Sequence, residues 1–397
     1  MPHDRWSRRD VLGGLLSAAA VGVGAPGVAT GASTTRAEDV VRRTGDVIRL
    51  GSNENPVGLG PAARAAFVAA ADDANRYPGR AEQRLVSALT AQHGIDESRL
   101  HLTPGSGELL RAATLAFTSA SRSLVVAAPT FEAPARTASA TGASVHAVPV
   151  TAEGRLDLDA MLAKASGAGL IYVCNPNNPT GGSVPATAVA EFVGRLKTAA
   201  PEARILIDEA YFEYADEPGF ATAIPLTTDP RVIVIRTFSK VFGMAGLRVG
   251  YAIAQPETLS ALAERGSYGT LSNASLAAAT AAFTDTTHLA AEKERNRTLR
   301  AATRTRFESA GYRVLPSAAN FLMIDIGRDA GQFGWACRQQ RIAVSRPFPP
   351  LSTFLRLTIG TQAEMDEAVP AILALLKAPA SARVEPAPAW WASGSDC

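Results

Sequence analysis

Lysine is scarce in this sequence. Of the 39 lysines and arginines in the 397 residues, only five are lysine. Four of them, Lys164, Lys197, Lys293 and Lys377, lie in stretches rich in Ala, Glu and Leu that are typical of helices, where a solvated lysine needs no special explanation. The fifth, Lys240, lies in RTFSKVFGMAGL, between a β-branched run and a Gly-rich segment. This setting indicates a chemical role for Lys240.

Cysteine and histidine are too few and too scattered to build the usual frameworks. The three cysteines, Cys174, Cys337 and Cys397, form no CxxC pair, and the five histidines form no HxxxH or HExxH pattern. A structural disulfide framework and a zinc site are therefore not expected. Cys174 lies in the apolar run LIYVCN and is most simply a buried core residue.

The sequence also lacks a long basic run, and its net charge is only +2. The charge pattern therefore gives no support to a nucleic-acid partner. With 47% hydrophobic and 19% charged residues, the composition is that of an ordinary globular protein. The length allows one large domain and a smaller one.

The first 35 residues differ from the rest of the chain. Paired arginines, Arg8 and Arg9, precede a weakly apolar stretch rich in Ala, Gly, Leu and Val, and small residues follow in GVATGAS. This order is typical of a twin-arginine export signal, with cleavage expected between residues 27 and 37. A chance pair of arginines and a membrane anchor are the alternatives, but the glycines and Pro26 argue against a stable anchor. Export would place the mature protein in the periplasm or outside the cell; without a functional signal it would be cytoplasmic.

From about residue 80, short apolar runs alternate with longer helical patterns. Strands that are apolar on both faces and separated by helices predict an α/β fold with a mostly parallel sheet. Ligands in such sheets bind at the carboxyl ends of the strands. The expected strands are residues 123–129, 169–175, 203–210, 231–238 and 246–254, and the expected helices are residues 81–94, 107–117 and 184–200.

The pattern changes after about residue 285. A long charged helix is followed by a strand, a helix, a strand around FLRLTIG and a closing helix to Lys377. This order predicts a smaller α+β domain, residues 285–380, completed by an N-terminal segment, residues 36–75, beside a large domain over residues 76–284. Residues 381–397 are rich in Pro, Ala and Ser without periodicity and are expected to form a loose tail.

A catalytic lysine typically forms a Schiff base with a carbonyl compound. Pyridoxal phosphate is a common partner, and it needs an acid at its pyridine nitrogen and cationic or backbone donors for its phosphate. Asp208 and Tyr211, in ILIDEAY at the end of an apolar strand, would serve the ring nitrogen and the ring hydroxyl. The alternative for Asp208 is an ordinary strand-end or helix-capping aspartate.

Donors for a phosphate are present in two further segments. Ser106 and Gly107, in LTPGSGELL, follow a strand and open a helix, and the backbone N–H groups of a helix N-terminus bind anions. Gly-Ser turns before helices are frequent, so this signal is weak alone. Ser239 directly precedes the lysine, and Arg248 follows in the same segment. Asn178, in NPNNPTGG, lies on a turn after a buried strand.

Together these motifs resemble the fold-type I pyridoxal-phosphate-dependent aminotransferases, and most closely their histidinol-phosphate aminotransferase branch. The motifs SNENP, RYP, PGSGE, APTF, NPNNPTG, DEAY, TFSK, AGLRVGY and FLRLTIG occur in the family's order between Val47 and Lys377. The resemblance implies a large α/β domain with a smaller α+β domain, a homodimer, and pyridoxal 5'-phosphate as cofactor. It implies that Lys240 forms the Schiff base and serves as the catalytic base.

The resemblance also implies the contacts of the cofactor and the substrate. The cofactor-binding residues would be Ser106, Gly107, Phe131, Asn178, Asp208, Tyr211, Ser239, Arg248 and, from the partner subunit, Tyr77. The substrate-binding residues would be Asn53, Arg346 and Arg356. In this interpretation Phe131 stacks on the ring, the guanidinium fork of Arg356 binds the α-carboxylate, and Arg346 binds the phosphate of the donor.

The predicted function is transamination of an amino acid or an amine such as histidinol phosphate with a 2-oxo acid such as 2-oxoglutarate. Two features depart from that branch: RAEDVVRRTGDVIRL contains no Pro-Tyr, and Phe131 stands where tyrosine is usual. An export signal is also unusual for a histidine-biosynthetic step, so an aromatic or other amino acid stays open as the donor. A decarboxylase or lyase resembling phosphothreonine decarboxylase, and a non-enzymatic secreted binding protein, are the alternative functions.

Overall fold

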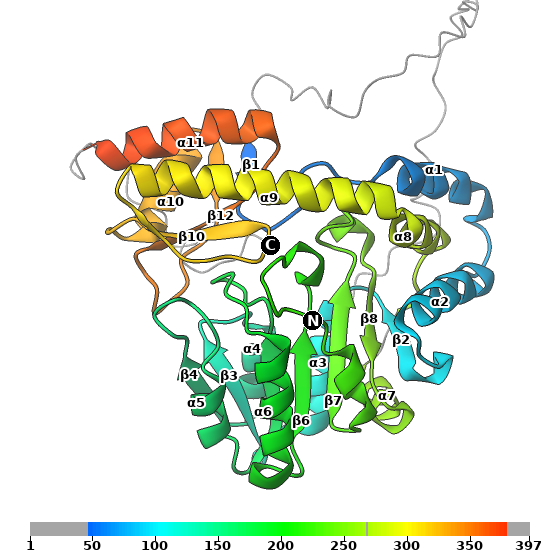
Figure 1. Ribbon diagram of the computed structural model, residues 1–397. Coiled ribbons are helices and arrows are strands. Elements are labelled where there is room, and N and C mark those ends of the chain that lie inside the picture. Colours follow the sequence, from blue (N-terminus) through cyan, green and yellow to red (C-terminus); the bar gives the residue numbers. More distant parts are fainter. Residues whose placement is uncertain (1–46, 267–268, 379–397) are drawn as a thin grey trace, which may run out of the picture. The chain divides into compact units, whose positions relative to one another are not determined.

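A seven-stranded sheet forms the centre of the fold in the computed structural model, which describes residues 47–266 and 269–378 (Figure 1). The expected export signal and the expected tail lie outside the described residues. The strand order is β2-β8-β7-β6-β5-β3-β4, and only β8 runs against its neighbours, which confirms the mostly parallel sheet. The strands are β2 (Leu100–Thr103), β3 (Ser123–Ala128), β4 (Val145–Pro149), β5 (Ala168–Cys174), β6 (Arg204–Asp208), β7 (Val232–Thr237) and β8 (Gly250–Ile253).

The sheet is covered by helices on both faces because its inner strands are apolar on both faces. On β5, Ile171 and Val173 belong to one core, whereas Leu170, Tyr172 and Cys174 belong to the other. The first core is closed by α1 (Pro61–Ala69), α2 (Gly79–His93), α5 (Leu158–Ala163), α6 (Ala186–Ala199) and α8 (Asn273–Thr284). The second is closed by α3 (Ser106–Phe117), α4 (Ala133–Ala140) and α7 (Pro256–Ala263). The helices expected at 81–94, 107–117 and 184–200 are confirmed as α2, α3 and α6.

A separate apolar core joins the two ends of the described chain. It contains Ile48 and Leu50 together with residues from Leu299 to Leu376. The helices and strands expected after residue 285 are all present, together with two short strands that were not expected, Arg313–Val314 and Ile342–Val344. The helix α1, which lies within the segment 36–75, packs into the first core of the large sheet. The elements of this region are β1 (Ile48–Leu50), α9 (Thr286–Ser309), β9 (Arg313–Val314), β10 (Phe321–Asp325), α10 (Ala330–Gln339), β11 (Ile342–Val344), β12 (Phe354–Thr358) and α11 (Gln362–Lys377).

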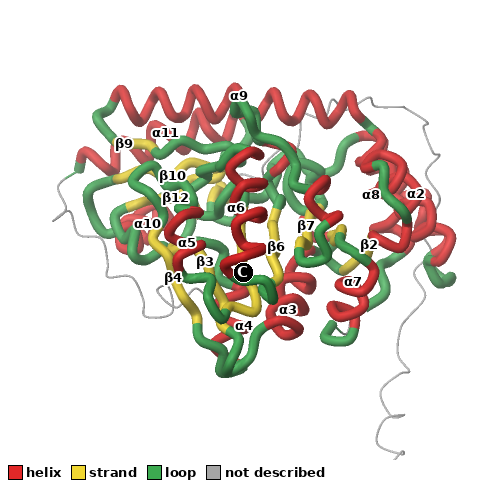
Figure 2. The backbone as a smooth tube through the Cα atoms, turned by 60° about the horizontal axis from the view of Figure 1, so that its bottom comes forward, coloured by secondary structure: helices red, strands yellow, loops and turns green. Residues whose placement is uncertain are grey.

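The strands of this second region form two small sheets. β10 pairs antiparallel with β12 and β9, and β1 pairs parallel with β11. The helix α9 runs from this region to α8, and Figure 2 shows α11 beside it and α2 beside α8. Within residues 47–266 and 269–378, no helix has the length and hydropathy needed to cross a bilayer. The described part of the chain also contains five short 3-10 helices: η1 (Ala70–Asp73), η2 (Glu97–Arg99), η3 (Phe212–Tyr214), η4 (Ile224–Thr228) and η5 (Ala245–Leu247).

Candidate active site

The candidate residues of the large sheet lie at the carboxyl ends of its parallel strands. Asp208 is the last residue of β6 and is paired in register with Cys174 of β5 and Ile235 of β7. Lys240 follows β7, and Asn178 follows β5. Carboxyl ends of parallel strands meet at one edge of a sheet, so residues far apart in sequence gather there. In Figure 1 the arrowheads of β6 and β7 point to the side where α9 and β12 lie.

Lys240 is held at this edge in a partly buried position. Its Nζ donates to the backbone oxygen of Asn53 (3.3 Å) and lies 5.5 Å from the ring centroid of Tyr211. Burial and the positive charge of Arg356 lower the pKa of Lys240 to about 8. An amine with this pKa is partly neutral at physiological pH, which a nucleophile and a proton carrier both require.

Asp208 is a buried carboxylate with two hydrogen-bond donors. Its side chain is closed off from solvent (3% exposed), with Tyr172 Oη donating to Oδ2 (2.8 Å) and the Ala210 N–H donating to Oδ1 (3.0 Å). Burial raises the pKa of Asp208 to about 6, although these donors and Lys240 oppose the shift. A buried anion of this kind is stabilised by an adjacent cation, such as a protonated ring nitrogen. The interpretation of Asp208 as only a helix cap does not account for Tyr172.

Tyr211 and Asn53 are joined across the two regions of the fold. Asn53 Nδ2 donates to Tyr211 Oη (2.9 Å), and Thr358 Oγ1 of β12 donates to Asn53 Oδ1 (3.1 Å). Asn53 adopts a left-handed backbone conformation with φ 54°, which non-glycine residues other than Asn and Asp rarely accept. Its backbone oxygen is thereby the acceptor for both Lys240 and Asn320.

The start of α3 offers backbone N–H groups beside an arginine, an arrangement that can bind an anion. The helix begins at Ser106 without a side-chain cap, so its first N–H groups have no partner from the N-cap Gly105. The Arg248 guanidinium packs directly against Gly105, whose φ of 82° and lack of a Cβ permit that approach. Arg248 Nη1 also reaches Ser239 Oγ (3.5 Å). A Cβ on Gly250 would collide with the Ser106 nitrogen.

Arg356 lies where the second region meets the large sheet. It is 7% exposed, and it donates through Nη1 to Asn178 Oδ1 and through Nη2 to the Gly51 oxygen, each at 2.6 Å. Its Cζ is 4.6 Å from the centroid of Phe348. Because its charge also lowers the pKa of Lys240, this arginine is near the reactive amine and able to bind an anionic group of a substrate.

Arg346 and Arg356 both contact the Phe348 ring. The Cζ of Arg346 is also 4.6 Å from that ring centroid, and its Nη2 pairs with Glu132 Oε1 at 2.7 Å. Glu132 directly follows Phe131, which is 39% exposed after β3. The structure therefore brings Phe131 and Arg346 to the same end of the site through Glu132, a residue that the sequence motifs did not single out.

Tyr77 is a candidate residue that lies exposed at the surface of its own chain. Its side chain is 94% exposed. The preceding residues are held in place from α8, since Asn273 Nδ2 donates to the backbone oxygens of Asp73 and Arg76 (2.9 and 2.8 Å). Tyr77 is therefore presented outward on a fixed segment.

A buried ion pair was also missed by the sequence analysis, although Glu209 belongs to the DEAY motif and Arg236 directly precedes the TFSK motif. Arg236 donates through Nε and Nη2 to Glu209 Oε2 (2.9 and 2.8 Å), and both side chains are almost fully buried. The guanidinium also stacks on Phe212, with Cζ 3.8 Å from the ring centroid. Glu209 directly follows Asp208, and Arg236 belongs to β7, after which Lys240 lies. The ion pair therefore holds the segments that carry Asp208 and Lys240 in a fixed relative position.

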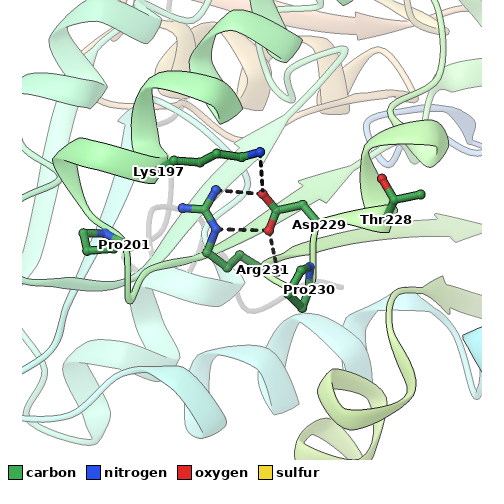
Figure 3. A pocket seen from close by; sticks show the side chains of 6 residues that line it. All are labelled: Lys197, Pro201, Thr228, Asp229, Pro230 and Arg231. Carbon is green, nitrogen blue, oxygen red and sulfur yellow. Dashed lines mark hydrogen bonds and ion pairs between the residues drawn. The ribbon is translucent and has the colours of Figure 1, made fainter.

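A pocket of about 420 Å³ lies at the opposite edge of the sheet (Figure 3). It is lined by Lys197, Pro201, Thr228, Asp229, Pro230 and Arg231. Asp229 already accepts from Arg231 (2.8 Å) and lies 3.8 Å from Lys197. Since this pocket precedes β7 and its charges are paired with one another, it does not compete with the carboxyl-end site.

Tyr172→Phe is expected to weaken cofactor binding through Asp208. Loss of a charge-assisted hydrogen bond of about 1.5–3 kcal/mol would raise the carboxyl pKa by roughly one to two units above its present value of about 6. At pH 7 a smaller fraction of Asp208 would then be ionised, so pyridoxal phosphate should bind about two- to tenfold more weakly, with a larger loss at pH 6 than at pH 8.5. Equilibrium titration with the cofactor over this pH range measures both effects.

The matched control is Tyr251→Phe, which removes another buried tyrosine hydroxyl, one bonded to His93 (3.1 Å) rather than to Asp208. It should leave the pH dependence of cofactor binding unchanged. Equal affinities of wild type and Tyr172→Phe at every pH would contradict the role of Tyr172.

Comparison with known proteins decides the family. The family described as "Aminotransferase class I and II" matches residues 45–372. The chain belongs to the class I and II aminotransferases. Two relatives named histidinol-phosphate aminotransferase are similar to this aminotransferase over most of its length. That of Shouchella clausii is 34% identical over 352 residues (86% of this chain, 94% of the relative), and that of Moorella thermoacetica is 35% identical over 345 residues (85% and 88%).

The solved structures include one with the cofactor. The histidinol-phosphate aminotransferase from Sinorhizobium meliloti in complex with pyridoxal 5'-phosphate superposes with a TM-score of 0.76, at 28% identity, over 83% of this chain and 91% of that one. Pyridoxal phosphate is the cofactor of this aminotransferase, and its reaction is transamination rather than decarboxylation or simple binding. The residues fit the group: an uncapped helix N-terminus beside Arg248 suits a phosphate, and the buried Asp208 suits a protonated ring.

Proposed function

We propose that this aminotransferase transfers an amino group to 2-oxoglutarate from a donor that carries an anionic group, either histidinol phosphate or an amino acid of similar size. Arg356 carries the proposal, because its buried guanidinium is held beside Asn178 and Phe348 and is close enough to lower the pKa of Lys240. A fork of N–H donors in that place binds a carboxylate or a phosphate. The names of the relatives support histidinol phosphate as the first donor to test.

The residues of the chain have distinct tasks in this reaction. Bound pyridoxal phosphate supplies an aldehyde for Schiff-base chemistry and a ring that accepts electrons from the substrate Cα. Lys240 is the residue that takes the proton from Cα and returns it, since its pKa of about 8 lets the amine do both near neutral pH. Asp208 would hold the ring nitrogen protonated, and Tyr211, oriented by Asn53 (2.9 Å), would donate to the ring oxygen.

A homodimer and export belong to the same proposal. The outward Tyr77, 94% exposed on a segment fixed by Asn273, supports a role in the site of a partner subunit. The order of Arg8, Arg9, an apolar stretch and small residues supports twin-arginine export to the periplasm or the cell exterior.

The test is a half-reaction without acceptor. We expect histidinol phosphate, or one of the twenty amino acids, to convert the visible absorbance of the cofactor-loaded enzyme to that of the pyridoxamine form, and 2-oxoglutarate to restore it. The compound that triggers the change identifies the donor. Absorbance that no donor converts, in an enzyme fully loaded with cofactor, would overturn the proposed donor class.

A further inference from the structure

Glu132 forms an ion pair with Arg346, the second arginine of the candidate site after Arg356. It is the N-cap residue of α4, and its Oε1 pairs with Arg346 Nη2 at 2.7 Å. Both side chains are partly exposed, at 40% and 35% respectively. The Cζ atoms of Arg346 and Arg356 each lie 4.6 Å from the centroid of the Phe348 ring, so they are no further apart than twice that distance. A short dianion whose first anionic group binds Arg356 can span this separation and place its second anionic group at Arg346.

Glu132 has another partner on its own helix. Its Oε2 lies 3.7 Å from Arg136 Nη1, one turn further along α4, where the Arg136 side chain is 73% exposed. The carboxylate therefore lies between a guanidinium at the site and a guanidinium at the surface. Release from Arg346 would leave it an ion pair rather than an isolated charge, so the release costs little.

We infer that Glu132 competes with the substrate for Arg346. The second anionic group of a dianionic substrate displaces the Glu132 carboxylate from Arg346 toward Arg136. This inference rests on the proposed function, and it specifies its substrates. A dicarboxylate such as 2-oxoglutarate exchanges for Glu132 at Arg346, whereas a donor with an uncharged side chain leaves the Glu132–Arg346 pair intact. Glu132 thus allows the site to accept dicarboxylates as well as donors with an uncharged side chain, and it lowers the affinity of the site for dianions.

The size of the effect follows from the exposure of the pair. Partly exposed ion pairs of this type contribute up to about 1 kcal/mol, which corresponds to about fivefold in a dissociation constant. Removing the competitor should strengthen dianion binding by that factor. Removing Arg136 should weaken dianion binding, because Glu132 then lacks its second ion-pair partner and remains paired with Arg346.

The experiment compares two unreactive ligands of the cofactor-loaded enzyme: glutarate, a dicarboxylate, and butyrate, a monocarboxylate of similar length. Their dissociation constants are read from the visible absorbance of the bound cofactor. In Glu132→Gln the constant for glutarate should fall about fivefold and that for butyrate should not change. In Arg136→Gln the constant for glutarate should rise, and Arg346→Gln should abolish the preference for glutarate over butyrate.

The matched control is Glu294→Gln, which breaks an exposed pair with Arg297 (2.7 Å) on α9 and should change neither constant. A glutarate constant that is unchanged in Glu132→Gln, or that shifts in the same direction in Glu132→Gln and Arg136→Gln, would overturn the inference. Failure of the proposed donors in the half-reaction is a separate result, because glutarate and butyrate binding requires no turnover.

Discussion

Lys240→Ala is expected to reduce transamination by at least about 10³-fold, because it removes the amine to which we assign both the Schiff base and the proton transfer. The remaining site would still contain Asp208, Arg248 and Arg356, so cofactor and substrate should both bind. Measurement of the half-reaction rate with the best donor, at saturating cofactor, separates the loss of chemistry from a loss of binding.

The control for this substitution is Lys377→Ala, at the exposed end of α11, which should retain wild-type activity. The pH dependence adds a second readout. Since the pKa of Lys240 is lowered to about 8 by burial and by Arg356, the rate at which cofactor-free enzyme captures pyridoxal phosphate should rise with pH and level off above about pH 8. Wild-type turnover by Lys240→Ala would remove the assignment.

Arg236→Met is expected to destabilise the fold by about 3–5 kcal/mol, since it leaves the buried Glu209 carboxylate without its charged partner. Glu213, 3.7 Å from Arg236, would lose a partner as well. Denaturant unfolding of the variant and the wild type measures the difference in the free energy of unfolding.

The pH dependence of this loss has a definite sign. Burial raises the pKa of Glu213 while Arg236 lowers it, so without Arg236 the folded state binds protons more tightly than the unfolded state. The stability of the variant should then fall as the pH rises from the unfolded carboxyl pKa through the raised folded one, and the loss should be larger at pH 8 than at pH 5.

Two comparisons make the stability prediction specific. Arg297→Met removes an arginine from the exposed pair with Glu294 (2.7 Å) and should cost less than about 1 kcal/mol. Arg236→Met combined with Glu209→Gln should recover part of the loss, because the neutral amide can still accept from the Ala223 N–H. Equal effects of Arg236→Met and Arg297→Met would show that the buried pair has no special role.

The sequence by itself was sufficient to predict the mostly parallel sheet, the alternation of helices and strands, the family and the transamination. Apolar β-branched runs that alternate with helices are typical of strands buried on both faces of such a sheet, and its carboxyl-end geometry brings Asp208 and Lys240 to one edge. The sheet and its carboxyl-end edge depend on local composition and on rules that hold for every parallel sheet, whereas the family and the transamination were predicted from the resemblance of the motifs.

Only the tertiary structure decided which side chains form hydrogen bonds and ion pairs with the candidate site residues Asp208, Tyr211 and Arg346. The bonds from Tyr172 to Asp208, from Asn53 to Tyr211 and from Glu132 to Arg346 each join segments that are distant in the sequence. Hydrogen bonds and ion pairs require atoms to meet within about 3 Å, and no pattern along the chain specifies such a meeting. The raised pKa of Asp208 and the competition between Glu132 and a substrate anion for Arg346 are therefore properties of the folded chain. Burial and neighbouring charges act only after the segments have packed together.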